Sequence, residues 1–208
     1  NFAAPGEGGG IVNRGTLLVV NSTIAGNGAT ANLGGGISNV GRVTLRHVTI
    51  ADNTAVVGGG IYHRTGTDVA LILENCIVAR NTGNQADIRR EAATTTVTSN
   101  GANLIGDNTS VETLFPVGVL AGNAANPLDA GLASFNEYGG PSSSIALLAG
   151  SPAIDAAIAL AEPRDSDQRG FNGTVGGASD LGAYELGPTL TVTTAADSGA
   201  GSLRAAVE

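Results

Sequence analysis

Apolar and polar residues alternate in three successive blocks of the first ninety residues, and each block follows the same pattern. Every block opens on a Gly-Gly-Gly-Ile string, continues through apolar residues spaced two apart, and closes on an asparagine. The spacing shifts to three once in each block, which indicates two short strands joined by a bend, because alternate residues of a strand share one face. The closing asparagines are Asn27, Asn53 and Asn81, and the inward columns are Leu17, Val43 and Leu71, then Val19, Leu45 and Leu73, then Ile24, Ile50 and Val78.

The repeat interval predicts the fold class. The closing asparagines lie 26 and then 28 residues apart, and self-similarity at such a period is typical of a solenoid. We therefore predict an all-β, right-handed parallel β-helix with a loop-rich C-terminal part and a short terminal strand plus helix. Stacked coils would place the asparagines above one another, where their side-chain amides can form a hydrogen-bonded ladder. The triple glycines suit sharp corners between strands.

The domain organisation follows from where the pattern weakens. Residues 1–88 are predicted to form coils of the parallel β-helix, and the regular spacing fades afterwards. Residues 89–186 are predicted to be further coils and loops of the same solenoid. Residues 187–208 are predicted to form a strand and a helix, and this segment is predicted to cap the next unit. Since the sequence opens on Asn1 almost directly into a coil, we expect a processed product or one part of a longer chain.

Several positions within the coils have a predicted environment. His47 falls on the bend between the two short strands, and we expect it to be a solvated polar residue. Outward neighbours such as Thr49 and Ile77 favour a strand without needing burial. Cys76 falls in an inward column, so we expect a small buried hydrophobe rather than a nucleophile.

Composition and charge exclude some classes of protein. The formal net charge of -8 argues against nucleic-acid binding, which requires a basic surface. No apolar run of about 18 residues occurs, so we expect no membrane span. We expect no cofactor, although calcium binding at turn residues such as Asp52 and Asp87 stays open.

The densest group of ionisable residues supports two interpretations. Glu162, Asp165 and Asp167 alternate with Arg164 and Arg169. These carboxylates could form a glycosidase site or a cation site, or they could pair with the arginines and fasten a loop to the side of the solenoid. We favour the second interpretation, and no catalytic residues are predicted. Aromatic residues make up only 3% of the chain, which also disfavours a sugar-binding cleft.

The C-terminal half resembles a known family. The strings NLIG, LLAGSPAID, DQRG and DLGAYE occur in that order, and they resemble the choice-of-anchor Q domains of bacterial surface proteins over roughly residues 85–186. The GGGI blocks are similar to parallel β-helix repeats and, more weakly, to the repeats of chlamydial polymorphic outer-membrane adhesins. The resemblance implies an exported protein that is extracellular or bound to the bacterial cell surface. It implies no established catalytic residues.

The last segment resembles the beginning of such a domain, not its end. A TVTT strand and a GSLR helix open related β-helices, whereas here they come last. Either the sequence is cut out of frame from a tandem array, or this segment caps the first coil of a next copy. Head-to-tail contacts that do not close on themselves produce filaments. The residues predicted to mediate self-assembly are Leu190, Val192, Leu203 and Val207.

These observations lead to a structural prediction of function. We expect a unit of an extracellular filament or surface adhesin, with its own kind as partner in a head-to-tail homopolymer or in tandem repeats. A cell-surface or glycan ligand stays open. The alternative is an extracellular polysaccharide lyase or hydrolase, or a lectin, on a β-helix scaffold.

Overall fold

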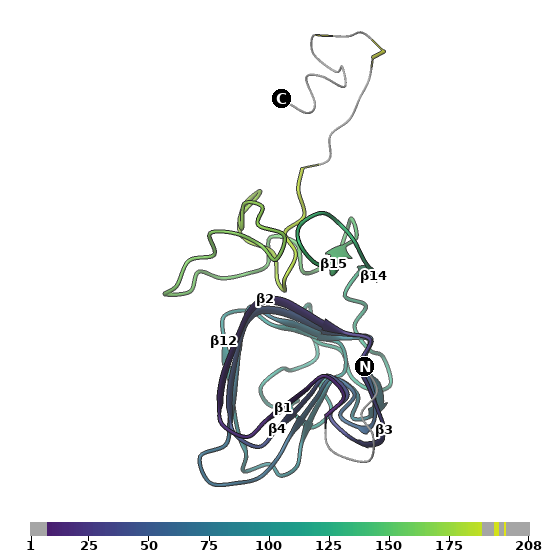
Figure 1. Ribbon diagram of the computed structural model, residues 1–208, viewed down its shortest axis with the longest axis vertical. Coiled ribbons are helices and arrows are strands. Elements are labelled where there is room, and N and C mark those ends of the chain that lie inside the picture. Colours follow the sequence, from purple (N-terminus) through teal and green to yellow (C-terminus); the bar gives the residue numbers. More distant parts are fainter. Residues whose placement is uncertain (1–7, 189–193, 196–197, 199–208) are drawn as a thin grey trace.

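The computed structural model describes residues 8–188, 194–195 and 198. Parallel strands stack there into a β-solenoid of about four turns, and Figure 1 looks down the stack, so that the coils overlap. The predicted all-β parallel β-helix is confirmed, and the predicted terminal strand and helix lie outside the described residues. The strands are β1 (Ile11–Asn13), β2 (Thr16–Ala25), β3 (Gly28–Leu33), β4 (Ile37–Asn39), β5 (Arg42–Ala51), β6 (Thr54–Val57), β7 (Ile61–His63), β8 (Ala70–Glu74), β9 (Ile77–Ala79), β10 (Thr82–Asn84), β11 (Ile88–Arg90), β12 (Thr96–Asn100), β13 (Leu104–Ile105), β14 (Leu132–Asn136) and β15 (Ser144–Leu147).

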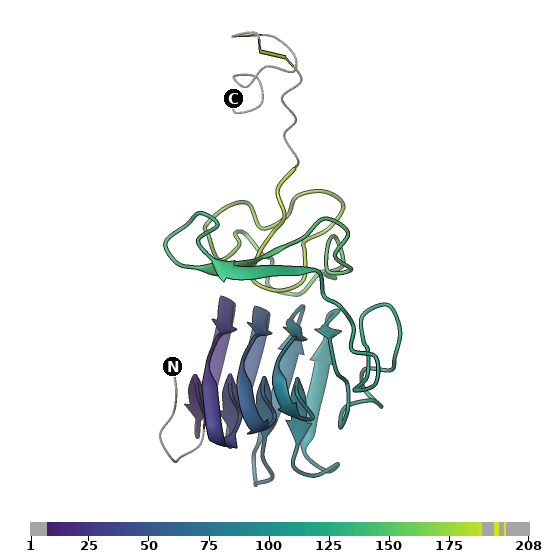
Figure 2. The same cartoon turned by 90° about the vertical axis from the view of Figure 1, so that its right-hand side faces the viewer.

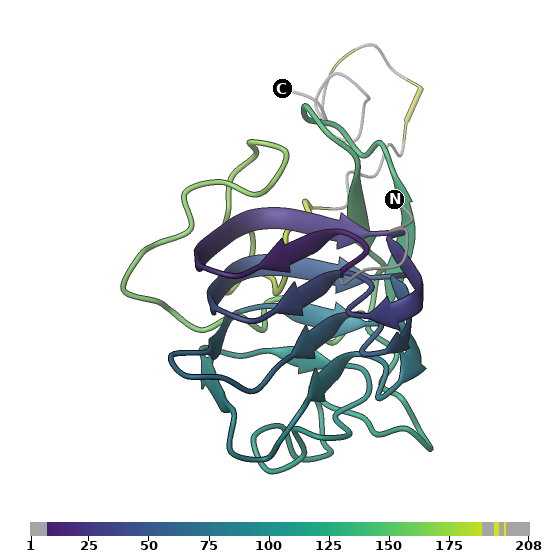
Figure 3. The same cartoon turned by 60° about the horizontal axis from the view of Figure 1, so that its bottom comes forward.

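Three parallel sheets form the walls of the solenoid, and the coils follow one another in chain order (Figure 3). One sheet has the order β1-β4-β7-β11, and a second has the order β10-β6-β3. The third contains β2, β5, β8, β9, β12 and β13. The register of this third sheet pairs the apolar columns residue for residue: Leu17, Val43 and Leu71, then Val19, Leu45 and Leu73, then Ile24, Ile50 and Val78.

The two ends of the solenoid differ. Val43 and Leu45 of the second coil are buried, whereas Leu17 and Val19 of the first coil are only half-buried. At the opposite end, the loop after β13 inserts Val111 and Phe115 into the same core. The described chain therefore closes the last coil with its own side chains and leaves the first coil partly open.

The triple glycines are explained by close contact between successive coils. Gly34 adopts a φ of +72°, which a residue with a side chain rarely reaches. At Gly59, which follows the equivalent glycine of the next coil, a Cβ atom would lie 2.3 Å from the carbonyl oxygen of Thr82. The first glycine of each string is thus required by the turn, and the second by the carbonyl of the neighbouring coil.

The bend inside the long strands has a backbone cause. Asn21, His47 and Asn75 adopt φ values of 44°, 49° and 55°. Asparagine and histidine are enriched among the non-glycine residues that accept this left-handed conformation. One such residue bends the strand, so that the next inward-facing residue comes three positions later instead of two. This is the spacing predicted from the sequence.

The C-terminal part lies along one side of the solenoid, above the coils in Figure 2. It consists of an antiparallel pair, β14 and β15, followed by residues 150–186, in which no strand is assigned. Leu132, Ile145 and Leu181 pack with Ile77 in a second apolar cluster outside the solenoid. The predicted division at residue 88 falls on the first strand of the fourth coil.

The outward-facing residues near the bend are buried, which contradicts the prediction for His47. Thr49 and Ile77 point outward, but they are 1% and 0% exposed because the C-terminal part covers them. His47 is not solvated, since it is only 3% exposed beneath the same cover. Burial on the outer face depends on residues more than a hundred positions away, which the local pattern does not reveal.

The predicted self-assembly residues, which are Leu190, Val192, Leu203 and Val207, lie outside the described residues. The described part of the chain contains no helix of the length and apolar character that a membrane crossing requires.

Candidate functional site

An asparagine ladder runs up one corner of the coils. Asn27 Nδ2 donates to Asn53 Oδ1 at 3.0 Å, and Asn53 Nδ2 donates to Asn81 Oδ1 at 3.0 Å. Asn81 Nδ2 then donates to the Asp87 carboxylate at 2.8 Å. The backbone N–H of each asparagine donates to the same side-chain oxygen as its amide does. These bonds give the ladder a structural role, because they satisfy buried polar groups at the corner.

A second ladder of side-chain hydrogen bonds lies at another corner of the coils. It was not predicted from the sequence. Asn13 Nδ2 donates to Asn39 Oδ1 at 2.7 Å, and Asn39 Nδ2 lies 3.1 Å from His63 Nδ1. His63 Nε2 lies 2.9 Å from the Thr96 carbonyl. Since an amide and a carbonyl fix the roles of the two ring nitrogens, His63 is the neutral tautomer with its proton on Nε2. The signal was present, because Asn13, Asn39 and His63 all stand two residues after the isoleucine of a GGGI string.

The bend residues hold the C-terminal part in place. Asn21 Nδ2 donates to the Ser166 carbonyl at 2.7 Å, and Asn75 Nδ2 donates to the Ile158 carbonyl at 2.8 Å. The backbone N–H of Ala183 donates to Thr49 Oγ1 at 3.0 Å. The outer face of the bend is therefore the surface on which residues 150–186 dock.

Buried carboxylates organise residues 150–186 in place of a strand ladder. Asp167 accepts Nε and Nη2 of Arg169 at 2.7 and 2.6 Å, and it also accepts the backbone N–H groups of Arg169, Phe171 and Glu185. Arg169 also stacks on the Tyr184 ring, with its guanidinium carbon 3.6 Å from the ring centroid. This is the fastening role favoured for the Arg and Asp residues. Glu162 and Asp165, the other members of the acidic group, are exposed.

Arg164 differs from Arg169 in how its guanidinium is paired. Its side chain is 1% exposed, and Nη1 donates to Glu185 Oε2 at 3.3 Å and to the Asp180 carbonyl at 3.2 Å. Within the described residues, its Nε and Nη2 atoms are buried without a hydrogen-bond partner. An unsatisfied buried polar group is unusual in a native fold, and it points to a missing partner.

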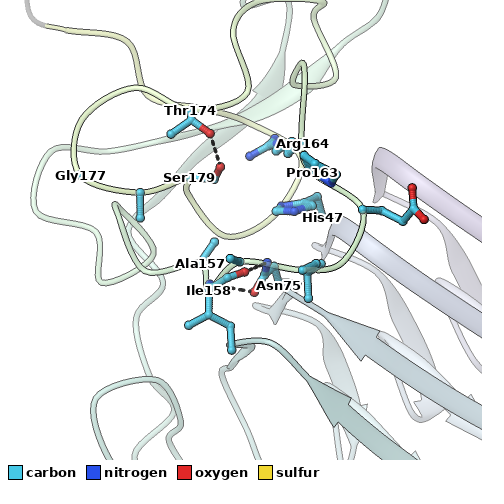
Figure 4. A pocket seen from close by; sticks show the side chains of 13 residues that line it. His47, Asn75, Ala157, Ile158, Pro163, Arg164, Thr174, Gly177 and Ser179 are labelled. Atoms are coloured by element: carbon cyan, nitrogen blue, oxygen red, sulfur yellow. Dashed lines mark hydrogen bonds between the residues drawn. The ribbon is translucent and has the colours of Figure 1, made fainter.

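A pocket of about 410 Å³ lies where Arg164 meets the bend (Figure 4). His47 and Asn75 form its floor on the solenoid side, while Arg164, Thr174 and Ser179 come from the C-terminal part. A second hollow of about 280 Å³ shares His47 and Arg164 with it. The remaining residues that line the larger pocket are Ala157, Ile158, Ala159, Leu160, Glu162, Pro163, Gly177 and Ala178.

The ionisable groups around this pocket have shifted pKa values. Burial and the nearby Arg164 charge lower the pKa of His47 to about 4, so its ring is neutral at pH 7. Burial raises the pKa of Glu185 to about 7, although backbone N–H groups of Asp180 and Val175 act in the opposite direction. Burial lowers the pKa of Arg164, and Glu185 opposes that shift. The wall of the pocket thus combines a buried guanidinium with a neutral imidazole.

Other candidate positions are occupied by structural contacts. Cys76 is fully buried, and burial raises the pKa of its thiol to about 12, so it is no nucleophile at neutral pH. Asp52 pairs with Arg80 at 2.7 Å, and Asp87 accepts the end of the asparagine ladder. No group of three or more His, Cys, Asp or Glu side chains converges as a metal site in the described part of the chain.

No protein-family model, no curated protein and no solved structure matches the chain.

Proposed function

We propose that this chain is a rod module of an extracellular filament or surface adhesin, and that copies join head to tail at the first coil. The observation that carries the proposal is the partly open first coil. Leu17 and Val19 are half-buried, whereas the equivalent Val43 and Leu45 are 1% and 0% exposed. Among the described residues, no further strand pairs with the outer edges of β1, β2 and β3. Unpaired edges over an apolar end face need a cap or a partner.

The closed opposite end supports a directional contact. Val111 and Phe115 fill the last coil from the chain's own loop, so that end does not accept a further coil in the same way. The last coil is covered and the first coil is partly open. This difference favours head-to-tail joining of copies over symmetric pairing of two identical ends. Copies that add in this sense form a filament unless the rotation between them closes a ring.

The proposed occupant of the open end is the segment 187–208 of another copy. This segment carries the alternating pattern TLTVTT, which suits a strand that pairs along β2, and the resemblance described above places such a strand before the first coil. The contact is the same whether copies are covalently continuous in a tandem array or assembled from separate chains. An adhesin would use the same rod to present a ligand-binding surface.

The enzymatic alternative, a lyase or hydrolase that acts on polysaccharide, has weaker support. Glycosidases need two carboxylates free to act on the bond between them, but Asp167 and Glu185 are both held by arginine and backbone N–H groups.

The test is self-association of the full chain, observed by negative-stain electron microscopy and by light scattering. We expect filaments or concentration-dependent oligomers, and their loss when residues 187–208 are deleted. A second variant, Val19→Glu, places a charge on the open face, and its matched control is Leu18→Glu on the same strand, where the side chain is already 58% exposed. We expect Val19→Glu to block association and Leu18→Glu to preserve it, with circular dichroism showing both folded. A full chain that stays monomeric at all concentrations, or a deletion without effect, would overturn the proposal.

A further inference from the structure

Arg164, which lines the pocket at the bend, has a buried and unpaired edge that suits a planar anion. An arginine presents two N–H groups side by side on its Nε–Nη2 edge, and this edge matches the two oxygens of a carboxylate. In Arg169 both nitrogens of the edge contact one carboxylate oxygen, Asp167 Oδ2, at 2.7 Å from Nε and 2.6 Å from Nη2. In Arg164 the same two nitrogens have no partner among the described residues, although the side chain is 1% exposed. The comparison within one segment shows which group Arg164 lacks.

The neighbouring side chains favour a ligand that also carries hydroxyl groups. His47 Nδ1 is buried without a partner in the described structure. Burial lowers the pKa of His47 to about 4, so the imidazole is neutral at pH 7 and can offer one donor and one acceptor nitrogen. Thr174 and Ser179, whose hydroxyl oxygens lie 2.6 Å apart, face Arg164 across the pocket (Figure 4). Together these groups suit both an anionic oxygen and several hydroxyls.

The size and the remaining walls of the pocket limit the ligand further. A volume of about 410 Å³ lies within the range of roughly 300–1,000 Å³ that small-molecule pockets occupy. Ile158, Leu160 and Pro163 supply an apolar side, against which the carbon skeleton of a sugar ring can pack. Arg164 lines the pocket, but its Nε and Nη2 atoms are buried, so a ligand reaches them only if the guanidinium rotates.

We propose that this pocket binds a hydroxylated carboxylate of monosaccharide size, that is, a sugar acid, with its carboxylate on the Nε–Nη2 edge of Arg164 and one hydroxyl hydrogen-bonded to His47 Nδ1. The site is independent of self-assembly, because it lies on the side of the solenoid and not at the first coil. It would give each module of a rod one lateral ligand site.

The test is isothermal titration of the full chain with galacturonate, galactose and sulfate as probes. Galacturonate carries a carboxylate where galactose carries a hydroxymethyl group. A comparison of their affinities therefore tests the Nε–Nη2 edge of Arg164. We expect galacturonate to bind at least about tenfold more tightly than galactose, since hydrogen bonds to a charged group are worth about one factor of ten or more. Equal binding of the two sugars, tighter binding of sulfate than of galacturonate, or no binding of any probe would overturn the proposal.

Variants separate the role of Arg164 from its contribution to the fold. Arg164→Lys keeps a positive charge but removes the Nε–Nη2 edge. We expect at least about a tenfold loss of galacturonate affinity. Ala178→Leu fills the pocket without touching Arg164, and it should abolish binding while thermal unfolding stays close to that of the original chain. Arg42→Gln, which removes a surface arginine that pairs with Asp68, is the matched control and should bind normally. Undiminished binding by Ala178→Leu would place the ligand elsewhere and refute the assignment.

Discussion

In the coils of residues 8–105, parallel backbone bonds and stacked aliphatic columns recur from one turn to the next. In residues 150–186, the backbone is held instead by single carboxylates that each accept several N–H groups. Asp155 accepts those of Gly177 and Ala178, and Asp180 accepts those of Asp155 and Leu186. The first region distributes its stability over equivalent contacts, whereas the second concentrates it in a few carboxylates, of which Asp167 and Asp180 are buried. The two regions should therefore respond differently to single substitutions.

The largest expected effect is the removal of one buried ion in the C-terminal segment. Asp167→Ala leaves Arg169 buried without its partner, and breaking a buried pair in this way costs about 3–5 kcal/mol. We expect hydrogen exchange to increase over residues 150–186 while the coils stay protected, with urea unfolding giving the free energy. Asp165→Ala, at an exposed position, is the control and should change little. Uniform loss of protection over both regions would contradict the comparison.

A core deletion in the coils should have the next largest effect. Leu73→Ala removes a side chain that is 0% exposed, and such deletions cost about 2–5 kcal/mol. The loss should appear in urea unfolding together with faster exchange in the neighbouring coils, because each coil buries the next. Leu18→Ala, at a side chain that is 58% exposed, should stay within about 0.5 kcal/mol. Similar losses in the two variants would mean that the columns are not the core.

A smaller effect is expected from crowding between coils. Gly59→Ala places a Cβ 2.3 Å from the Thr82 carbonyl oxygen, and forcing such a contact apart costs about 1–3 kcal/mol. Gly15→Ala is the matched control, because a Cβ there meets nothing within 4 Å. The midpoint of thermal unfolding measures both. A neutral Gly59→Ala would show that the coils separate more easily than their hydrogen bonds indicate.

The smallest expected effect concerns the junction of the two regions and depends on pH. The pKa of His47 in the fold is about 4, below its ordinary value of 6.5, so the unfolded chain binds the proton more readily and stability is lost as pH falls from 6.5 toward 4. Glu185 acts in the opposite sense, since its raised pKa of about 7 means that stability is lost as pH rises from about 4.5 through 7. His47→Asn removes only the first contribution.

We therefore expect His47→Asn to gain about 1–2 kcal/mol relative to the original chain between pH 7 and pH 4.5. Urea unfolding at the two values measures the difference. Asparagine suits the site because the equivalent positions, Asn21 and Asn75, adopt the same left-handed backbone conformation. A difference that does not change with pH would show that His47 is not held neutral by the fold.

The coils could be predicted because their signal is local and repeated. The paired positions of Leu17, Val43 and Leu71 follow directly from a spacing that recurs three times. The ladder that ends at His63 was not predicted, because a histidine stands where the two earlier coils have an asparagine. The change of residue type obscures the equivalence of the three positions.

The candidate pocket could not be predicted, for a physical reason. Its two walls come from residues 47–75 and 157–179, and nothing in the pattern of either segment indicates that they meet. Arg164 and Arg169 look alike in the sequence, yet only the fold decides which of them has Asp167 against its Nε–Nη2 edge. Burial of a charged group by distant chain is a tertiary effect, and periodicity carries no information about it.

The asparagine ladder gives the rod a polarity. From Asn27 to Asn81, each bond between side-chain amides runs from the first-coil side toward the last coil, while Asn53 Nδ2 also donates back to the Ile24 carbonyl. If copies add at the first coil as proposed, a side-chain amide donor placed before Asn27 would continue the ladder in the same sense.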